Sequence, residues 1–322
     1  MNTKPNAKTV AKKVIGAVIF ILLLAVIMLL LSHWFYPQKG EDLTMQDVKP
    51  NGVLAEPDNT LDVLFFGDSE AYTAFAPVHM WKEKGFPSFV CASSSQYLSL
   101  TESFVHQALE HQKPKVIILE TNAFYRKIRG DNAILTRIEN MFSILQYHNR
   151  WKTMAPIQFS SADTYQWKDD MKGYKYAKMT TKGKNKRYMK KTGQQEPISQ
   201  TNQQYVKSIV DYCHKKGVQV LFVSAPSSKN WKTERHNAVA ALAKQTGAQY
   251  LDLNKQNLDI DWHTDTADGG DHLNFRGAKK VSSFMSQYLA DTYALQDKRE
   301  DAAYSEWNTL VEKYEYLTAE DE

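Results

Sequence analysis

Cysteine is nearly absent from this sequence: Cys91 and Cys213 are the only two among 322 residues. So few thiols exclude a scaffold stapled by several disulfides, which small extracellular domains use in place of a large core. Cys91 lies in a strand-like run and Cys213 in a helical one, so we expect two buried thiols rather than a bridge. Apolar residues make up 43% of the chain, which is enough to build a real core.

Acidic residues are absent from the first 40 positions, where a long apolar run stands instead. Residues 14–31 carry no charge and a single glycine, and Trp34, Phe35 and Tyr36 follow them. At about 1.5 Å per residue, such a run just crosses a hydrocarbon layer of about 30 Å. We therefore expect an uncleaved transmembrane anchor over residues 14–36. A cleaved signal peptide is the alternative, although the run is long for one and no small-x-small cleavage pattern follows it.

The charges on either side of this run predict its orientation. Four lysines precede it, at positions 4, 8, 12 and 13, whereas Glu41 and Asp42 follow it. Because positive charge stays on the cytoplasmic side, we expect a single-pass protein of a cell membrane, with its N-terminus inside and its main domain extracellular. The formal net charge of +4 is matched by these four lysines, so the outer domain is near neutral and we expect no nucleic-acid partner.

Five short apolar runs predict buried strands. They are LDVLFFG (61–67), FPSFVCA (86–92), KVIILET (115–121), VQVLFVSAP (218–226) and AQYLDL (248–253). Continuous apolar strands are typical of a parallel sheet that is covered on both faces. Helical patterns lie at 99–112, 201–217, 234–247 and 274–295, with Thr201 as a candidate cap of the second. This order predicts an α/β fold with three layers, α/β/α, around a parallel five-stranded sheet.

Composition divides the chain into five parts. We expect a cytoplasmic tail over 1–13, the anchor over 14–36, an extracytoplasmic stalk over 37–60, the main domain over 61–297 and a C-terminal helix and tail over 298–322. An insert over 123–199 shows no strand signal and contains the basic tract KGYKYAKMTTKGKNKRYMKK, residues 172–191. We expect this tract to be a solvated excursion. The alternative is a surface that binds a polyphosphate polymer or anionic lipid headgroups.

Polar clusters lie after four of the five expected strands. Gly67-Asp68-Ser69 comes after the first strand, Ser93 to Gln96 after the second, Glu120-Thr121-Asn122 after the third, and Asp268 to Asn274 before the last core helix. Because reactive groups of an open parallel sheet gather at the carboxyl ends of its strands, we expect these clusters to meet.

Each of these signals is modest when taken singly. Asp68 and Ser69 are residues that cap ordinary helices, Asn122 is a common turn residue, and His272 fits a loop. The ordered set is more informative, because a hydroxyl nucleophile needs a base, an acid that orients the base, and donors for the developing oxyanion. The sequence supplies all of these groups in compatible places.

The set resembles the SGNH (GDSL-type) hydrolase superfamily, whose four sequence blocks carry Ser, Gly, Asn and His. Ser69 matches the first block, Asn122 the third and His272 the fourth. The resemblance implies that Ser69 is the nucleophile and His272 its base. It also implies an oxyanion hole made by the N–H groups of Ser69 and Ser95 and by the side-chain amide of Asn122.

Two departures from the family pattern concern the second and fourth blocks. Ser95 stands where the family has glycine, and its side chain would crowd the oxyanion hole. The family spacing Asp-x-x-His is broken because position 269 is glycine. Asp268 and Asp271 are therefore both candidates for the acid that orients His272. Asp268 is slightly favoured, since an extra glycine lets it reach back.

The N-terminal anchor and the insert containing HNRW resemble the envelope acyl-transfer branch of the superfamily. That branch includes the D-alanyl-transfer protein of teichoic acid synthesis and the alginate and peptidoglycan O-acetyltransferases. The resemblance implies an extracytoplasmic serine O-acyltransferase or esterase that modifies a cell-envelope glycopolymer through an acyl-serine intermediate. It also implies a partner, a multi-pass membrane-bound O-acyltransferase. Asp68, Arg126 and Trp151 are expected to contact the substrate.

Two other functions remain open on the sequence. One is a hydrolytic carbohydrate or lipid esterase with the same site, and the other is a non-catalytic scaffold that binds polymer for a membrane acyltransferase. The acidic stretch DIDWHTDTADGGDH, residues 259–272, suggests a metal loop, but it lacks the EF-hand spacing and its histidines have no cysteine partners. We expect no metal and no cofactor.

Overall fold

The computed structural model describes residues 7–35, 48–127, 138, 142, 144–147, 169–183 and 188–319. Its centre is a parallel five-stranded sheet in the order β2-β1-β3-β4-β5. The strands are β1 (Val63–Gly67), β2 (Ser88–Ala92), β3 (Val116–Glu120), β4 (Gln219–Ser224) and β5 (Gln249–Asp252). Each strand lies within one of the five apolar runs of the sequence, so the predicted α/β fold is confirmed.

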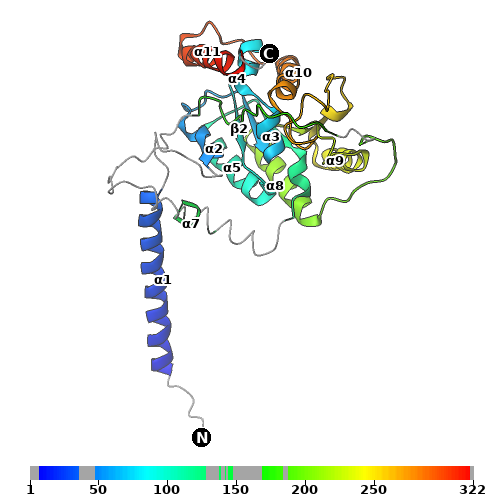
Figure 1. Cartoon of the computed structure of the whole chain (residues 1–322). Coiled ribbons are helices and arrows are strands. Elements are labelled where there is room, and N and C mark those ends of the chain that lie inside the picture. The colour runs from blue at the N-terminus through cyan, green and yellow to red at the C-terminus, as the bar shows by residue number, and fades with distance from the viewer. Residues whose placement is uncertain are drawn as a thin grey trace.

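Helices cover both faces of the sheet, as Figure 1 shows. The helices α5 (Leu98–His111), α8 (Gln200–Lys215) and α9 (Thr233–Thr246) pack against one face, and α3 (Ser69–Ala74) and α10 (Phe275–Tyr293) against the other. Alternate residues of a strand point to opposite faces of the sheet. Leu64 and Phe66 of β1 belong to the core beneath α5, α8 and α9, and Phe65 belongs to the core beneath α3 and α10. Because β1, β2 and β3 are buried throughout, their sequences are apolar without alternation.

The remaining described elements are shorter or lie outside this sandwich. They are α1 (Ala7–Phe35), α2 (Val48–Asn51), α4 (Pro77–Lys84), α7 (Ile144–Tyr147), α11 (Ser305–Thr318) and the 3₁₀ helices η1 (Gly52–Ala55), η2 (Thr121–Tyr125), η4 (Leu253–Lys255) and η5 (Ala302–Tyr304). The charged C-terminal helix expected from residue 298 begins at Ser305, and it packs against α4.

Two helix starts differ from the sequence expectation. Helix α4 was not expected, although Pro77 in its first turn and Gly85 at its left-handed end (φ 69°) are ordinary helix boundaries. Thr201 does not cap α8. Ser199 caps it instead, because its side chain accepts a hydrogen bond from the Asn202 N–H.

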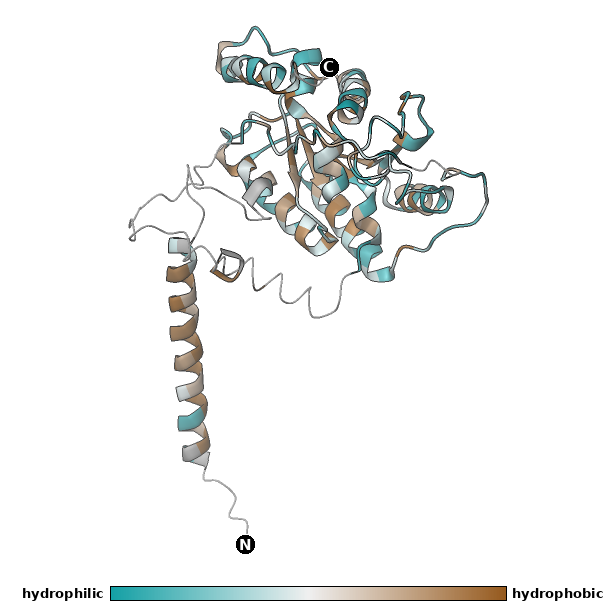
Figure 2. Ribbon diagram, in the orientation of Figure 1, coloured by the Kyte–Doolittle hydropathy of each residue, from teal (hydrophilic) through white to brown (hydrophobic). Residues whose placement is uncertain are grey.

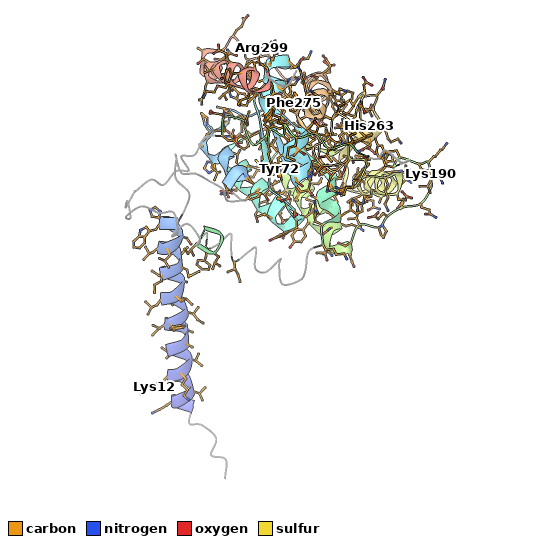
Figure 3. All side chains as sticks on the ribbon, in the orientation of Figure 1. Lys12, Tyr72, Lys190, His263, Phe275 and Arg299 are labelled. Carbon is orange, nitrogen blue, oxygen red and sulfur yellow. The ribbon has the colours of Figure 1, made fainter. Side chains whose placement is uncertain are left out.

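The N-terminal helix α1 stands apart from the domain in Figure 1. Its segment Val10–Trp34 is long and apolar enough to cross a membrane, and its apolar side chains are largely exposed. Near its end Ser32 is buried, and its Oγ accepts a hydrogen bond of 3.1 Å from the Ile144 N–H of α7. Figure 2 shows this helix as one mostly hydrophobic rod, and Figure 3 shows Lys12 near its N-terminal end. By length and composition the helix is a membrane anchor or a signal sequence. Tyr36 lies outside the described residues.

The end of the predicted stalk and the start of the basic tract pack against each other. Glu56 and Lys172 form an ion pair of 2.6 Å in which both side chains are buried, and Val53 and Tyr174 are buried nearby in the sequence. The expectation of a solvated excursion is therefore wrong for residues 172–174. Tyr174 carries enough apolar area to be buried, while the described lysines that follow it stay exposed.

The two cysteines behave as the sequence predicted. Cys91 in β2 and Cys213 in α8 are free and buried in the same core cluster. Burial raises the pKa of both thiols, that of Cys213 to about 12. Both are therefore packing residues.

Candidate active site

The turn after β1 places Ser69 at the first position of helix α3. Asp68 is the N-cap, and its Oδ1 accepts a hydrogen bond of 3.0 Å from the Glu70 N–H. Gly67 has to be glycine, because a Cβ there would lie 2.6 Å from the Cβ of Glu120 on the neighbouring strand. Asp68 thus caps the helix, which leaves the side chain of Ser69 available for other contacts.

That side chain meets the imidazole of His272. Ser69 Oγ lies 2.8 Å from His272 Nε2, and His272 Nδ1 lies 2.6 Å from Asp268 Oδ2. Since a carboxylate accepts, the Nδ1 proton belongs in the bond to Asp268, and Nε2 is then free to accept the Ser69 hydroxyl proton. The structure brings together the three residue types that nucleophilic acyl transfer needs.

Two glycines allow Asp268 to reach back across four positions. Gly269 and Gly270 have φ values of 84° and 96°, a region that favours glycine. The tight loop that they form lets Asp268 Oδ1 also accept the backbone N–H of His272, at 2.8 Å. One carboxylate therefore holds both the main chain and the ring of His272.

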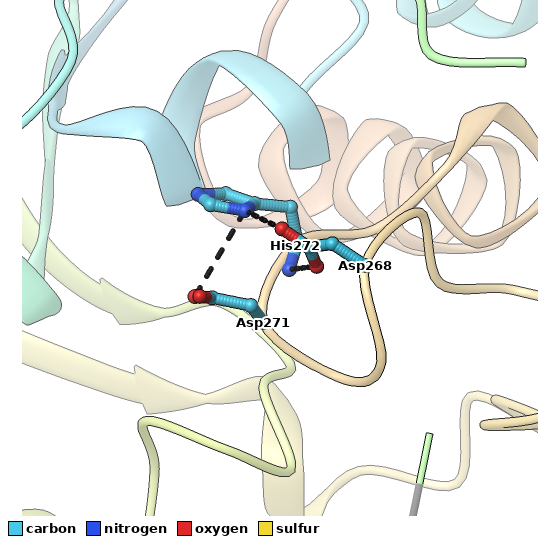
Figure 4. A group of neighbouring side chains, drawn as sticks. All are labelled: Asp268, Asp271 and His272. Atoms are coloured by element: carbon cyan, nitrogen blue, oxygen red, sulfur yellow. Dashed lines mark hydrogen bonds and ion pairs between the residues drawn. The ribbon is translucent and has the colours of Figure 1, made fainter. Parts of the chain in front are cut away.

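Asp271 faces the same ring nitrogen from a greater distance. Its Oδ1 lies 3.9 Å from His272 Nδ1, and Figure 4 shows both carboxylates directed at that nitrogen. Asp271 is instead bound by Lys229, at 3.0 Å, and by the side-chain amide of Asn230. Asp268 is thus the carboxylate that contacts the His272 ring directly, and Asp271 links the loop to the segment after β4.

The electrostatics of Asp268 agree with this assignment. Burial acts to raise the pKa of the Asp268 carboxyl, but its hydrogen bonds with His272 outweigh that effect and lower the pKa below its usual value. The carboxylate is thus charged at neutral pH and is able to stabilise an imidazolium.

Asn122 lies beside the nucleophile turn at the end of β3. Its side-chain Nδ2 donates to Asp68 Oδ2 at 3.0 Å, and its backbone N–H donates to Glu120. Arg126 binds the same Asp68 oxygen through Nε at 2.7 Å and Nη2 at 2.6 Å. Asp68 is completely buried by these partners. A substrate can therefore reach Arg126, which keeps partial exposure, but not the carboxylate of Asp68.

Ser95 is exposed in the turn that follows β2. It has a φ of 55°, the left-handed conformation in which the related sequence pattern has glycine. The turn is fixed by the buried Gln96, whose Oε1 accepts both the N–H and the hydroxyl of Ser93. Ser95 therefore has a strained backbone conformation, in a turn that is fixed by the hydrogen bonds of Gln96.

Two buried carboxyl groups lie next to the nucleophile. Burial, then repulsion by Asp68, raises the pKa of Glu120 to about 8. Burial, then repulsion by Glu120 and Asp68, raises the pKa of Glu70 well above its usual value. Burial and mutual repulsion therefore shift both carboxyl groups toward their neutral form, which limits the negative charge around Ser69.

Several residues of the site were not anticipated from the sequence. Asn230 bridges Glu70 and Asp271, and Arg235 donates to Asn122 Oδ1 at 3.2 Å. Tyr72, one turn after Ser69, interacts with the hydroxyls of Ser69 and Ser94. Asn230 and Arg235 follow β4, so their position at the carboxyl end of a strand is the signal that could have found them.

Asp268, Asp271 and His272 are also close enough together to be considered as metal ligands. However, His272 already uses Nδ1 for Asp268 and Nε2 for Ser69. Asp271 is bound by Lys229, whose charge opposes a cation. The donor set therefore suits a proton relay better than a metal ion.

Of the tryptophans, only Trp151 was expected to contact the substrate. Trp151 lies outside the described residues. Trp231 and Trp262 are buried and belong to the two cores, so their rings are not available as sugar platforms.

No family model and no curated protein matches this chain. Among solved structures, it is similar to a protein of Bacteroides fragilis assigned as an acylhydrolase, with 12% identity, a TM-score of 0.39 and coverage of 80% of this chain and 100% of that one. A lipolytic protein of the G-D-S-L family from Desulfitobacterium hafniense gives 13% identity, a TM-score of 0.39 and coverage of 72% and 100%. A GDSL-like lipase of Bacteroides thetaiotaomicron gives 10%, 0.36, and coverage of 71% and 87%.

The chain is thus similar in structure, at low identity, to hydrolases of the SGNH/GDSL type. At such scores the likeness decides nothing about activity, which has to follow from the contacts of Ser69, His272 and Asp268.

Proposed function

We propose that the protein is a membrane-attached serine acyltransferase that acts on a cell-envelope glycopolymer through an acyl ester of Ser69. One observation carries this proposal: a continuous chain of hydrogen bonds from Ser69 Oγ through His272 to Asp268, with lengths of 2.8 and 2.6 Å. A merely structural serine at a helix start needs no such pair behind it. The same geometry counts against a decayed, non-catalytic site.

In the first half-reaction, His272 Nε2 takes the hydroxyl proton of Ser69 while Oγ bonds to the carbonyl carbon of an ester or thioester. The negative charge on the carbonyl oxygen is stabilised by the N–H groups of Ser69 and Ser95 and by the amide of Asn122. The Ser69 N–H is suited to this because it lies in the first turn of α3, where a helix offers it no acceptor. The leaving alkoxide or thiolate then takes the proton from Nε2, and acyl-Ser69 remains.

In the second half-reaction, His272 Nε2 takes the proton of an acceptor hydroxyl, whose oxygen attacks the acyl carbon. The bond to Ser69 Oγ breaks, and the proton returns to Oγ. Asp268 keeps the imidazole in the required tautomer through both halves. A sugar or polyol hydroxyl as acceptor gives transfer, and water gives hydrolysis.

Helix α1 supports the envelope part of the proposal, because a domain attached beside the membrane is close to envelope polymers and to multi-pass acyltransferases. The proposed partner is a membrane-bound O-acyltransferase that delivers the acyl group across the bilayer. We expect such a protein to co-purify with the full-length chain in mild detergent.

The catalytic part is tested with the full-length chain in detergent and a small activated ester such as p-nitrophenyl acetate. Ser69→Ala is expected to lower the turnover number about 10³-fold or more, because the nucleophile is lost. Ser283→Ala is the matched control. Ser283 Oγ also lies 2.7 Å from a histidine, His79, but on helix α10 outside the site. Mass spectrometry should find the acyl group on Ser69 after a rapid acid quench. Turnover that survives Ser69→Ala, with no acylated serine, would exclude the proposed mechanism.

Transfer is separated from hydrolysis by adding acceptor polymer to the same assay. Acyl groups that appear on a teichoic acid or polysaccharide support transfer. Release of free acid alone, whatever polymer is added, would make the protein a hydrolytic esterase with the same site.

A further inference from the structure

The side chain of Asn122 presents an orientation problem at the proposed oxyanion hole. Its amide oxygen and nitrogen have nearly the same size, so packing alone does not choose between the two flipped forms. The hydrogen-bond partners choose, because the oxygen only accepts and the nitrogen only donates. An oxyanion donor has to be the nitrogen.

Arg235 contacts one end of this amide and Asp68 the other, and both contacts favour the same orientation of the amide. Arg235 Nη1, which only donates, lies 3.2 Å from Asn122 Oδ1. The carboxylate of Asp68, which accepts, lies 3.0 Å from Asn122 Nδ2. The flipped amide would set N–H against guanidinium and carbonyl oxygen against carboxylate, so that both contacts become repulsive.

Arg235 is itself held rigidly. Its Nε and Nη2 bind Glu196 Oε1 at 3.1 and 3.0 Å, and its Nη1 also donates to the carbonyl oxygen of Asn230 at 2.8 Å. The guanidinium carbon lies 4.3 Å from the centre of the Tyr125 ring. Because these contacts already fix the planar guanidinium of Arg235, its hydrogen bond to Asn122 Oδ1 costs little further conformational entropy. No lysine could make the same set of contacts.

We propose that Arg235 is a positioning residue that fixes the flip state of Asn122 and so keeps an amide hydrogen available for the oxyanion. The kinetic consequence rests on the proposed acyl-transfer function, whereas the orientation itself does not. Glu196 belongs to this device, because it lies at the end of the insert and holds the guanidinium in place.

The kinetic test uses Arg235→Met in the full-length protein. We expect the turnover number to fall about 10- to 100-fold with little change in KM, somewhat less than the loss of a whole oxyanion donor. Arg235→Lys should restore only part of the rate. In an Asn122→Ala background, Arg235→Met should lower the rate less than about twofold further, because the two residues act as one unit. Equal losses in both backgrounds would overturn the inference.

Lys232→Met is the matched control. Lys232 also pairs with Glu196, at 2.7 Å, but among the described residues it forms no hydrogen bond with Asn122. It removes one cation from the same carboxylate, so a merely structural role of this cluster would affect both variants alike. We expect Lys232→Met to keep a rate within about twofold of the wild type.

A second readout does not depend on turnover. In full-length protein labelled with ¹⁵N-asparagine, the two side-chain N–H signals of Asn122, assigned by their loss in Asn122→Ala, should be sharp and well separated. They should broaden or move in Arg235→Met and stay in place in Lys232→Met. Unchanged signals in Arg235→Met would refute the positioning role even if the wild type proves to have no activity, which would separately refute the proposed function.

Discussion

The turn that carries Ser69 and the loop that carries His272 are built in opposite ways. In the turn, Asp68, Ser69 and Glu70 are all buried, and the cap bond is made within three residues. In the loop, Asp268 is exposed and His272 is only partly covered. The loop is held from outside: Gly269 donates to the Thr181 carbonyl oxygen, and Gly270 accepts from Lys229.

The side chains of Ser69 and His272 are therefore held in position by different parts of the molecule. The nucleophile is part of the core, so its position follows from the sheet and from α3. The base is placed by contacts with the basic tract and with the segment after β4. Changes in the loop should therefore affect activity strongly and stability less, and changes in the turn should affect both.

The largest effect in the loop should come from Asp268. Asp268→Asn is expected to lower the turnover number about 10²–10⁴-fold, because an amide no longer fixes the imidazole proton on Nδ1. Asp271→Asn is the matched comparison and should cost less than about tenfold, since Asp271 is 3.9 Å from the ring and bound elsewhere. Ester hydrolysis assays of both variants check this. A larger loss for Asp271→Asn would reverse the assignment of the two carboxylates.

Gly270→Ala tests whether the loop geometry itself matters. A Cβ at this position would lie 2.1 Å from Ser228 Oγ, and its φ of 96° is unfavourable for alanine. We expect about 1–3 kcal/mol lower unfolding free energy and at least a tenfold lower turnover number. Gly193→Ala is the control, because a Cβ added at Gly193 would meet no atom of another described residue within 4 Å apart from its chain neighbours. Denaturant unfolding and the ester assay measure both effects, and equal behaviour of the two variants would contradict the described loop.

The buried turn should make stability depend on pH. Burial raises the pKa of Glu120 in the folded protein to about 8 from its ordinary value of 4.5, so the folded state binds more protons and its stability falls as pH rises between these values. Glu120→Gln should flatten part of this fall. Glu70, whose pKa is also raised, should keep some of the slope. Melting temperatures between pH 4 and 9 check this, and identical slopes in wild type and variant would show that Glu120 does not titrate in this range.

The smallest expected effect is that of Ser95→Gly, on the third loop of the site. Relief of the left-handed serine should raise the unfolding free energy by less than about 1 kcal/mol, since glycine also gains freedom in the unfolded chain. The turnover number should be kept or modestly increased. A clear loss of activity would mean that the Ser95 side chain, and not only its backbone, serves the site.

The sequence predicted the five strands and the two-faced sheet well, because buried parallel strands are continuous apolar runs that can be recognised locally. It also put Ser69 and Asn122 at strand ends and His272 just before the last core helix, and the fold brings the three together. It did not find Arg235 or Asn230, because an arginine in a helix's first turn and an asparagine in a loop look like surface residues until their partners are known. It misjudged residues 172–174 for the same reason: nothing local shows that Lys172 meets Glu56.

The apolar N-terminal helix, the layered α/β architecture and the reactive groups could all be read from the sequence, since they depend on local hydrophobicity and residue chemistry. The tertiary contacts show what the sequence left open: Asp268 and not Asp271 bonds to the His272 ring, Arg126 and Asn122 bind Asp68, and Arg235 donates to the Asn122 amide oxygen. Those choices depend on distances of about 3 Å between atoms far apart along the chain, and no periodicity or motif encodes such distances.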